Sequence, residues 1–112
     1  MGVPLHQVKA ELFRTLGHPV RVRVLELLQD GPLAVRDLLA EIDVEASNLS
    51  QQLAVLRRAG LVISSREGAL VVYALSTTDV ADLLAAGRRI LASVLDDRDG
   101  LREQLRAEGT FR

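Results

Sequence analysis

The chain has 112 residues, of which 48% are hydrophobic and only 3% are aromatic, and its net charge is −1. This length and composition predict a single domain, residues 1–112, with an aliphatic core, and they exclude a disordered chain. The lack of cysteine excludes disulfides, thiolate metal sites and a cysteine nucleophile. No apolar run reaches the roughly 20 residues that cross a bilayer, so we expect a soluble, cytoplasmic protein with no membrane partner.

Two helices are predicted before residue 31. The first follows Pro4 and places four aliphatic residues on one side at helical spacing: Leu5, Val8, Leu12 and Leu16. Gly17 breaks this helix, and Pro19 can occupy the first position of the next, "VRVRVLELL". The β-branched alternation of that segment is also compatible with a strand. We predict a helix because "VLELL" continues the 3.6-residue period until Gly31–Pro32 ends it.

Two further helices are predicted on either side of the turn "DVEA". The segment "LAVRDLLAEI" predicts a short helix, and "ASNLSQQLAVLRR" predicts a second one in which Leu49, Leu53 and Leu56 share the buried face. Gly60 stands where a left-handed residue ends a helix. The face opposite the leucines is expected to hold Asn48, Gln51, Gln52, Val55 and Arg58.

After residue 60 the pattern changes to that of strands. The runs "LVISSR" and "LVVYAL" flank Glu67–Gly68, which predicts a hairpin in which glycine supplies a positive φ. A long helix over "TTDVADLLAAGRRILASVLDD" follows, capped by Thr77 or Thr78, and residues 98–112 form a charged tail. The apolar set of the long helix is wider than one small core needs: Val80, Leu83, Leu84, Ile90, Leu91, Val94 and Leu95.

Three helices followed by a hairpin predict a mainly α fold, the winged helix-turn-helix, with the helix-turn-helix at 35–60 and the wing at 61–75. The helix before Gly60 is then the recognition helix. Asn and Gln can pair with adenine, Ser with bases or phosphate, and Arg with guanine or phosphate, whereas a merely solvated helix face usually carries Glu and Lys. The predicted DNA-binding residues are Ser47, Asn48, Ser50, Gln51, Gln52, Arg57, Arg58 and Arg66.

Positive charge is local in this sequence. Residues 29–43 hold four acidic side chains and a single arginine, so a few placed arginines must supply any affinity for DNA. This low basic charge leaves open a winged-helix module that docks a protein partner. An enzyme has little support and no catalytic residue is assigned, because G-x-S-x-G, H-E-x-x-H and Gly-rich phosphate-loop motifs are all missing.

Three segments carry a resemblance to a known family: "LGHPVRVRVLELL", "ASNLSQQLAVLRRAGLV" and "REGALVVYAL". They resemble the signature blocks of the ArsR/SmtB family of bacterial winged-helix repressors, over roughly residues 8–95. The strongest match is S-x-x-S-x-x-L-x-x-L-x-x-A-G-L-V, which runs from Ser47 to Val62. Members commonly have His at the position of Gln52, so the sequence preference of this chain is left open.

The resemblance implies a transcriptional regulator, a repressor, that binds a palindromic operator in double-stranded DNA as a homodimer. The first and last long helices, at 1–16 and 79–97, would join the two chains, and this pairing would cover the excess apolar surface of the last helix. The implied dimer contacts are Leu5, Val8, Leu12, Leu83, Leu84, Ile90, Leu91 and Val94.

The metal sites common in this family do not fit the sequence. Where metal sensors of the family have Cys-Val-Cys, this chain has Ala34-Val35-Arg36, and its last helix has carboxylates such as Asp79 and Asp82 but no histidine. Nickel and zinc sites normally need imidazole nitrogen. We expect a structural role for His18, while His6 leaves open a non-standard nickel or zinc site with carboxylates. We therefore assign no metal and no cofactor, and the inducer stays open.

Overall fold

The computed structural model describes residues 2–95 and 99–110. Internal contacts divide the chain into two compact units, Met1–Val80 and Ala81–Arg112, which are described separately below. Within the described residues, no helix combines the length and the apolar character needed to cross a membrane.

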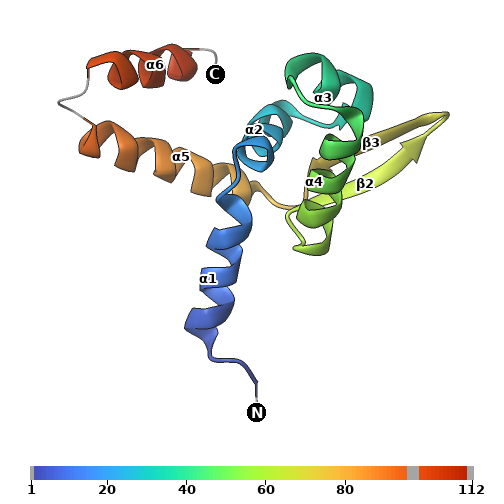
Figure 1. Ribbon diagram of the computed structural model, residues 1–112, viewed down its shortest axis with the longest axis horizontal. Helices are drawn as coiled ribbons and strands as arrows, with labels where there is room; N and C mark the ends of the chain where they lie inside the picture. Colours follow the sequence, from blue (N-terminus) through green and yellow to red (C-terminus); the bar gives the residue numbers. More distant parts are fainter. Residues whose placement is uncertain (1, 96–98, 111–112) are drawn as a thin grey trace. The chain divides into compact units, whose positions relative to one another are not determined.

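The elements follow the order expected of a winged helix-turn-helix (Figure 1). The helices are α1 (Leu5–Leu16), α2 (Pro19–Leu27), α3 (Val35–Glu41), α4 (Ala46–Arg58), α5 (Thr78–Val94) and α6 (Asp99–Thr110), with a 3₁₀ turn η1 (Leu28–Asp30) after α2. The strands are β1 (Leu33–Ala34), β2 (Val62–Glu67) and β3 (Leu70–Leu75). The mainly α fold with a hairpin is confirmed.

The break between α1 and α2 has a clear local cause. Pro19 occupies the first turn of α2, where its missing N–H costs nothing. Nδ1 of His18 accepts a hydrogen bond from the backbone N–H of Val20 at 3.2 Å and so caps the helix. His18 therefore has the structural role that the sequence predicted.

The sheet has three antiparallel strands in the order β1-β3-β2, one more than the predicted hairpin. Pairing of β2 with β3 ends at Glu67 and Leu70, so the connecting loop has two residues, and Gly68 supplies the positive φ of 64° at its first position. The prediction that Leu33 and Ala34 belong to the next helix is wrong. These residues form β1, which pairs with β3, and α3 begins at Val35.

The core of the first unit is aliphatic, as the composition predicted. Its largest fully buried side chains come from α2, η1, α3, α4 and β2: Val24, Leu25, Leu28, Leu38, Leu49, Leu53, Leu56 and Val62. The three leucines of α4 are at most 1% exposed, so the predicted buried face of this helix is confirmed. Burial of each such side chain contributes about 1.5–3 kcal/mol, so the leucine face fixes which side of α4 remains available to a ligand.

The last long helix begins after Thr77, whose Oγ1 accepts a hydrogen bond from the backbone N–H of Asp79 at 3.2 Å. The helix ends at Val94, and residues 96 and 97 of the predicted 79–97 segment lie outside the described residues. Helix α6 occupies most of the predicted charged tail 98–112, of which 98, 111 and 112 are not described.

Candidate nucleic-acid interface

Helix α4 has two sharply different faces. The leucine face packs into the core, and the other face exposes Ser47, Ser50, Gln51, Arg57 and Arg58. The thirteen residues of α4 include no Asp or Glu. The hydrogen-bonding groups on the exposed surface are therefore all neutral or basic. Such groups can form hydrogen bonds with base edges and with phosphates.

The prediction that Gln52 lies on this exposed face is wrong. Its side chain is only 9% exposed, and its Oε1 accepts a hydrogen bond from Nε of Arg21 at 2.8 Å. Its Nε2 donates to Oδ1 of Asn48 at 2.9 Å. An amide can be buried at low cost when both of its ends are hydrogen-bonded, and this position borders the leucine face. Gln52 thus lies beneath the exposed face and contacts it through Asn48.

Arg21 is a component of the site that sequence reasoning missed. Besides the bond from its Nε to Gln52, Arg21 donates a hydrogen bond from Nη1 to the backbone oxygen of Thr15 at 3.1 Å. The guanidinium of this α2 residue therefore links the C-terminal end of α1 to α4. The sequence does contain a signal for this role. Arg21 precedes Val24 by three positions and Leu25 by four, and this spacing places it on the buried side of α2.

The end of α4 positions the wing. Gly60 has a φ of 79°, as predicted for a left-handed cap. Its N–H donates to the backbone oxygen of Arg57 at 3.0 Å, and the N–H of Leu61 donates to that of Leu56, also at 3.0 Å. These two bonds form a Schellman motif, which turns the chain abruptly from the helix into β2. Oγ of Ser76 secures the turn by donating to the oxygen of Gly60 at 2.7 Å.

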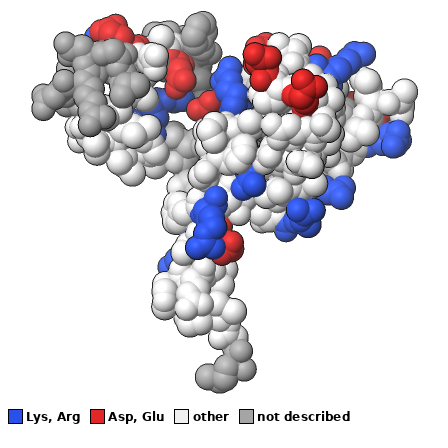
Figure 2. Space-filling view, viewed as in Figure 1, with Lys and Arg blue, Asp and Glu red and all other residues white. Residues whose placement is uncertain are grey.

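Charge is distributed unevenly over the first unit. Figure 2 shows basic side chains at the C-terminal end of α4 and near the tip of the hairpin, and acidic side chains over α3. Arg57 and Arg58 belong to the first group, and Nη1 of Arg57 lies 3.4 Å from Oγ of Ser64 on β2. Arg66 is exposed on β2, one residue before Glu67. The local basic charge expected from the sequence therefore borders α4 and the wing.

Large apolar side chains are exposed in both units. On α1 these are Leu5, Val8 and Phe13, which are 66%, 53% and 57% exposed. On α5 they are Ile90, Leu91 and Val94, which are 63%, 47% and 70% exposed. The other predicted dimer contacts are half-buried: Leu12, Leu83 and Leu84. Phe13 was not among the predicted dimer contacts, although it follows Leu5 by eight positions, a spacing that lies within the apolar stripe of an amphipathic helix.

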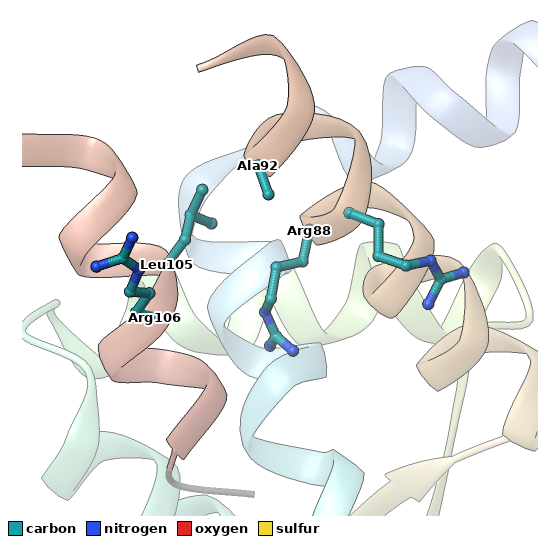
Figure 3. Close-up of a pocket in the computed structure, with 5 residues that line it drawn as sticks. Arg88, Ala92, Leu105 and Arg106 are labelled. Carbon is teal, nitrogen blue, oxygen red and sulfur yellow. The ribbon is translucent and has the colours of Figure 1, made fainter. Parts of the chain in front are cut away.

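The second unit contains a pocket of about 330 Å³ lined by Arg88, Arg89, Ala92, Leu105 and Arg106. In Figure 3 the side chains of Ala92 and Leu105 reach into the space between α5 and α6, whereas the guanidinium groups of Arg88 and Arg106 lie apart from each other. These two guanidinium groups do not converge on one point, as a binding site for a single anion would require.

The described residues include no group of three or more His, Asp or Glu side chains placed to hold one metal ion. His6 is exposed on α1, and His18 is engaged in its cap.

Comparison with known proteins identifies the family. Residues 18–64, which span α2 to β2, match the bacterial regulatory protein family arsR. The HTH-type transcriptional regulator Rv0081 of Mycobacterium tuberculosis is 50% identical over 108 residues, which cover 96% of this chain and 95% of the relative. The chain belongs to the arsR family. It is a DNA-binding transcriptional regulator, as the sequence predicted.

Other relatives agree with this assignment. The biofilm growth-associated repressor of Agrobacterium fabrum is 40% identical over 77 residues, which are 69% of this chain and 66% of the repressor. The crystal structure of M. tuberculosis Rv0081 superposes on this arsR-family chain with a TM-score of 0.80, covering 87% of this chain and 98% of that one.

A second solved structure is a homodimer. The solution structure of the homodimeric winged helix-turn-helix DNA-binding domain of Mb0332 from Mycobacterium bovis has a TM-score of 0.74 and 28% identity. The match covers 84% of this chain and 87% of that domain.

Proposed function

We propose that this regulator binds a palindromic operator as a homodimer, with α4 of each chain in the major groove of one half-site. The observation that carries the proposal is the division of α4 into a buried leucine face and an exposed face without any carboxylate. Ser47, Ser50, Gln51 and Arg58 recur on this face at helical spacing, so one groove can receive all four. Asn48, half-exposed in the first turn of α4, completes the set.

Two arginines are proposed to hold the backbone. Arg57 leaves α4 on the side of β2, and Arg66 lies one residue before the last pair of the hairpin, so both extend the basic surface beyond the groove. Phosphate contacts from such residues set the position of the protein on the duplex without reading its sequence. Glu67, next to Arg66, repels phosphate, so we assign the wing less of the affinity than α4.

The dimer is proposed to form through α1 and α5. Each helix exposes large aliphatic or aromatic side chains that a single chain leaves in water, and symmetric pairing would remove them from it. The homodimeric relative from M. bovis supports this arrangement. A dimer would present two α4 helices to the two halves of a palindrome.

The proposed outcome is repression. A dimer on a promoter blocks access of the transcription machinery without any covalent step, and the relative from A. fabrum is named a repressor.

Mobility-shift titration of the DNA upstream of the chain's own gene tests the proposal. We expect the double variant Gln51→Ala, Arg58→Ala to lose at least tenfold in affinity, because two exposed groove contacts are removed while the leucine face is kept. Arg106→Ala on α6 is the control, since it removes one exposed arginine outside the winged helix. Equal affinities of the double variant and the wild type would refute the assignment of α4 as the recognition helix.

A further inference from the structure

The buried amide of Gln52 has a fixed orientation. A guanidinium carries only hydrogen-bond donors, so the atom of Gln52 that faces Nε of Arg21 at 2.8 Å has to be the oxygen. The amide nitrogen of Gln52 must then point the other way. The 9% exposure of Gln52 leaves it little freedom to exchange these partners for water.

The orientation of the Gln52 amide also fixes the orientation of the Asn48 amide. Nε2 of Gln52 is a donor, so the atom of Asn48 that lies 2.9 Å away has to be the oxygen Oδ1. With Oδ1 directed at Gln52, the amide nitrogen Nδ2 is the end of Asn48 that remains for a ligand. Asn48 is half-exposed in the first turn of α4, the part of a recognition helix that most often reaches base edges.

We propose that Arg21 and Gln52 are positioning residues that make Asn48 a hydrogen-bond donor toward DNA. This inference rests on the proposed role of α4. A donating Asn48 selects bases whose major-groove edge accepts: guanine through O6 and N7, or thymine through O4. It disfavours cytosine, which presents a donor, and it disfavours the two-bond contact with adenine, which needs the oxygen and the nitrogen of Asn48 together.

The test compares operator preferences selected from a randomised pool of duplexes. The base read by Asn48 is the position whose preference disappears in Asn48→Ala. At that position we expect the wild type to prefer guanine or thymine over cytosine by about 5- to 100-fold, the range of a good base contact.

The decisive variant is Gln52→Glu. A carboxylate still accepts the hydrogen bond from Arg21 but cannot donate to Asn48, so the amide of Asn48 turns over and presents its oxygen. The preference should then move to cytosine or adenine. Gln51→Glu is the matched control, since it adds the same charge to an exposed position of the same helix and should weaken binding without changing the base preferred at the position that Asn48 reads.

A second variant keeps the test decisive if Gln52→Glu does not fold. Asn48→Asp has the shape of the wild-type residue but no donor, so it too should select cytosine. The inference is overturned if the wild type already prefers cytosine, or if Asn48→Ala changes no preference. It is also overturned if the folded Gln52→Glu or Asn48→Asp variant retains the wild-type preference. A wild type that enriches no sequence would overturn the proposed function itself.

Discussion

Nε of Arg21 and Oε1 of Gln52 form a hydrogen bond of 2.8 Å that spans 31 positions of the sequence and joins α2 to α4. Hydrophobic contacts of the leucine face decide which side of α4 is exposed, but they do not orient an individual polar side chain, because they have no direction. A hydrogen bond between two fixed helices does have direction. The pair therefore sets the orientation of the Gln52 amide, which in turn orients Asn48 at the edge of the exposed face.

The first prediction concerns the stability that this pair provides. Arg21→Met leaves the buried oxygen of Gln52 without a donor and should lower the free energy of unfolding by about 1–3 kcal/mol. Adding Gln52→Leu removes the unpaired group, so the double variant should be more stable than the sum of the two single losses predicts. Urea unfolding at one fixed protein concentration measures all four proteins. Strictly additive losses would show that the two side chains are not coupled.

The second prediction concerns the end of α4. Alanine at position 60 would have to adopt the positive φ of 79°, although an added Cβ meets no atom within 4 Å. Gly60→Ala should therefore cost about 1–2 kcal/mol through backbone strain alone. Gly17→Ala is the control, because Gly17 has a φ of −81° and an added Cβ meets only backbone oxygens at 3.5 Å, so alanine fits without strain and should gain up to about 1 kcal/mol. Thermal or urea unfolding would contradict the strain argument if both variants shifted stability in the same direction.

The sequence predicts much of this fold because most of its signals are local. The leucine spacing of α4, the left-handed Gly60 and the proline at the start of α2 each depend on a few neighbouring residues. Strand β1 could not be predicted in this way. It has two residues, too few for a recognisable period, and it exists only because Leu33 pairs with Tyr73 forty positions later.

The sequence predicted most of the residues of the candidate site, but it did not predict the direction of every side chain. An amide at the border of an apolar stripe suits either face, so the position of Gln52 depends on Arg21, which lies on another helix. The exposed residues Ser47, Ser50 and Gln51 needed no such partner, because their distance from the leucine stripe already placed them.

The third prediction concerns assembly. Ile90 on α5 and Ile63 on β2 are 63% and 57% exposed, so a substitution of Ile63 is a matched control for one of Ile90. Ile90→Glu should convert the dimer to a monomer in sedimentation equilibrium, because a charge cannot be buried unpaired in an apolar interface. Ile63→Glu should leave the dimer intact. Equal behaviour of the two variants would place the interface elsewhere.

The fourth prediction concerns metals. The chain has no thiolate, α5 has no histidine, and the one exposed histidine of the described residues, His6, stands without a cluster of ligands around it. Adding Zn(II) or Ni(II) to the protein should therefore leave its operator affinity unchanged within twofold, and calorimetry should detect no stoichiometric binding. A metal-dependent loss of affinity that His6→Ala abolishes would instead establish a non-standard site.

The fifth prediction separates DNA binding from protein docking. If Arg57 and Arg66 of both chains contact phosphates, about four condensed cations are released, and the logarithm of affinity should fall against the logarithm of salt concentration with a slope of about −4. Arg66→Ala removes up to two of these contacts per dimer and should make the slope shallower by about 2. Gln51→Ala is the control, because an uncharged side chain releases no ions, so the affinity should fall while the slope is kept. A flat salt dependence in the wild type would mean that the phosphates are not the partners of these arginines, and it would favour a module that binds another protein.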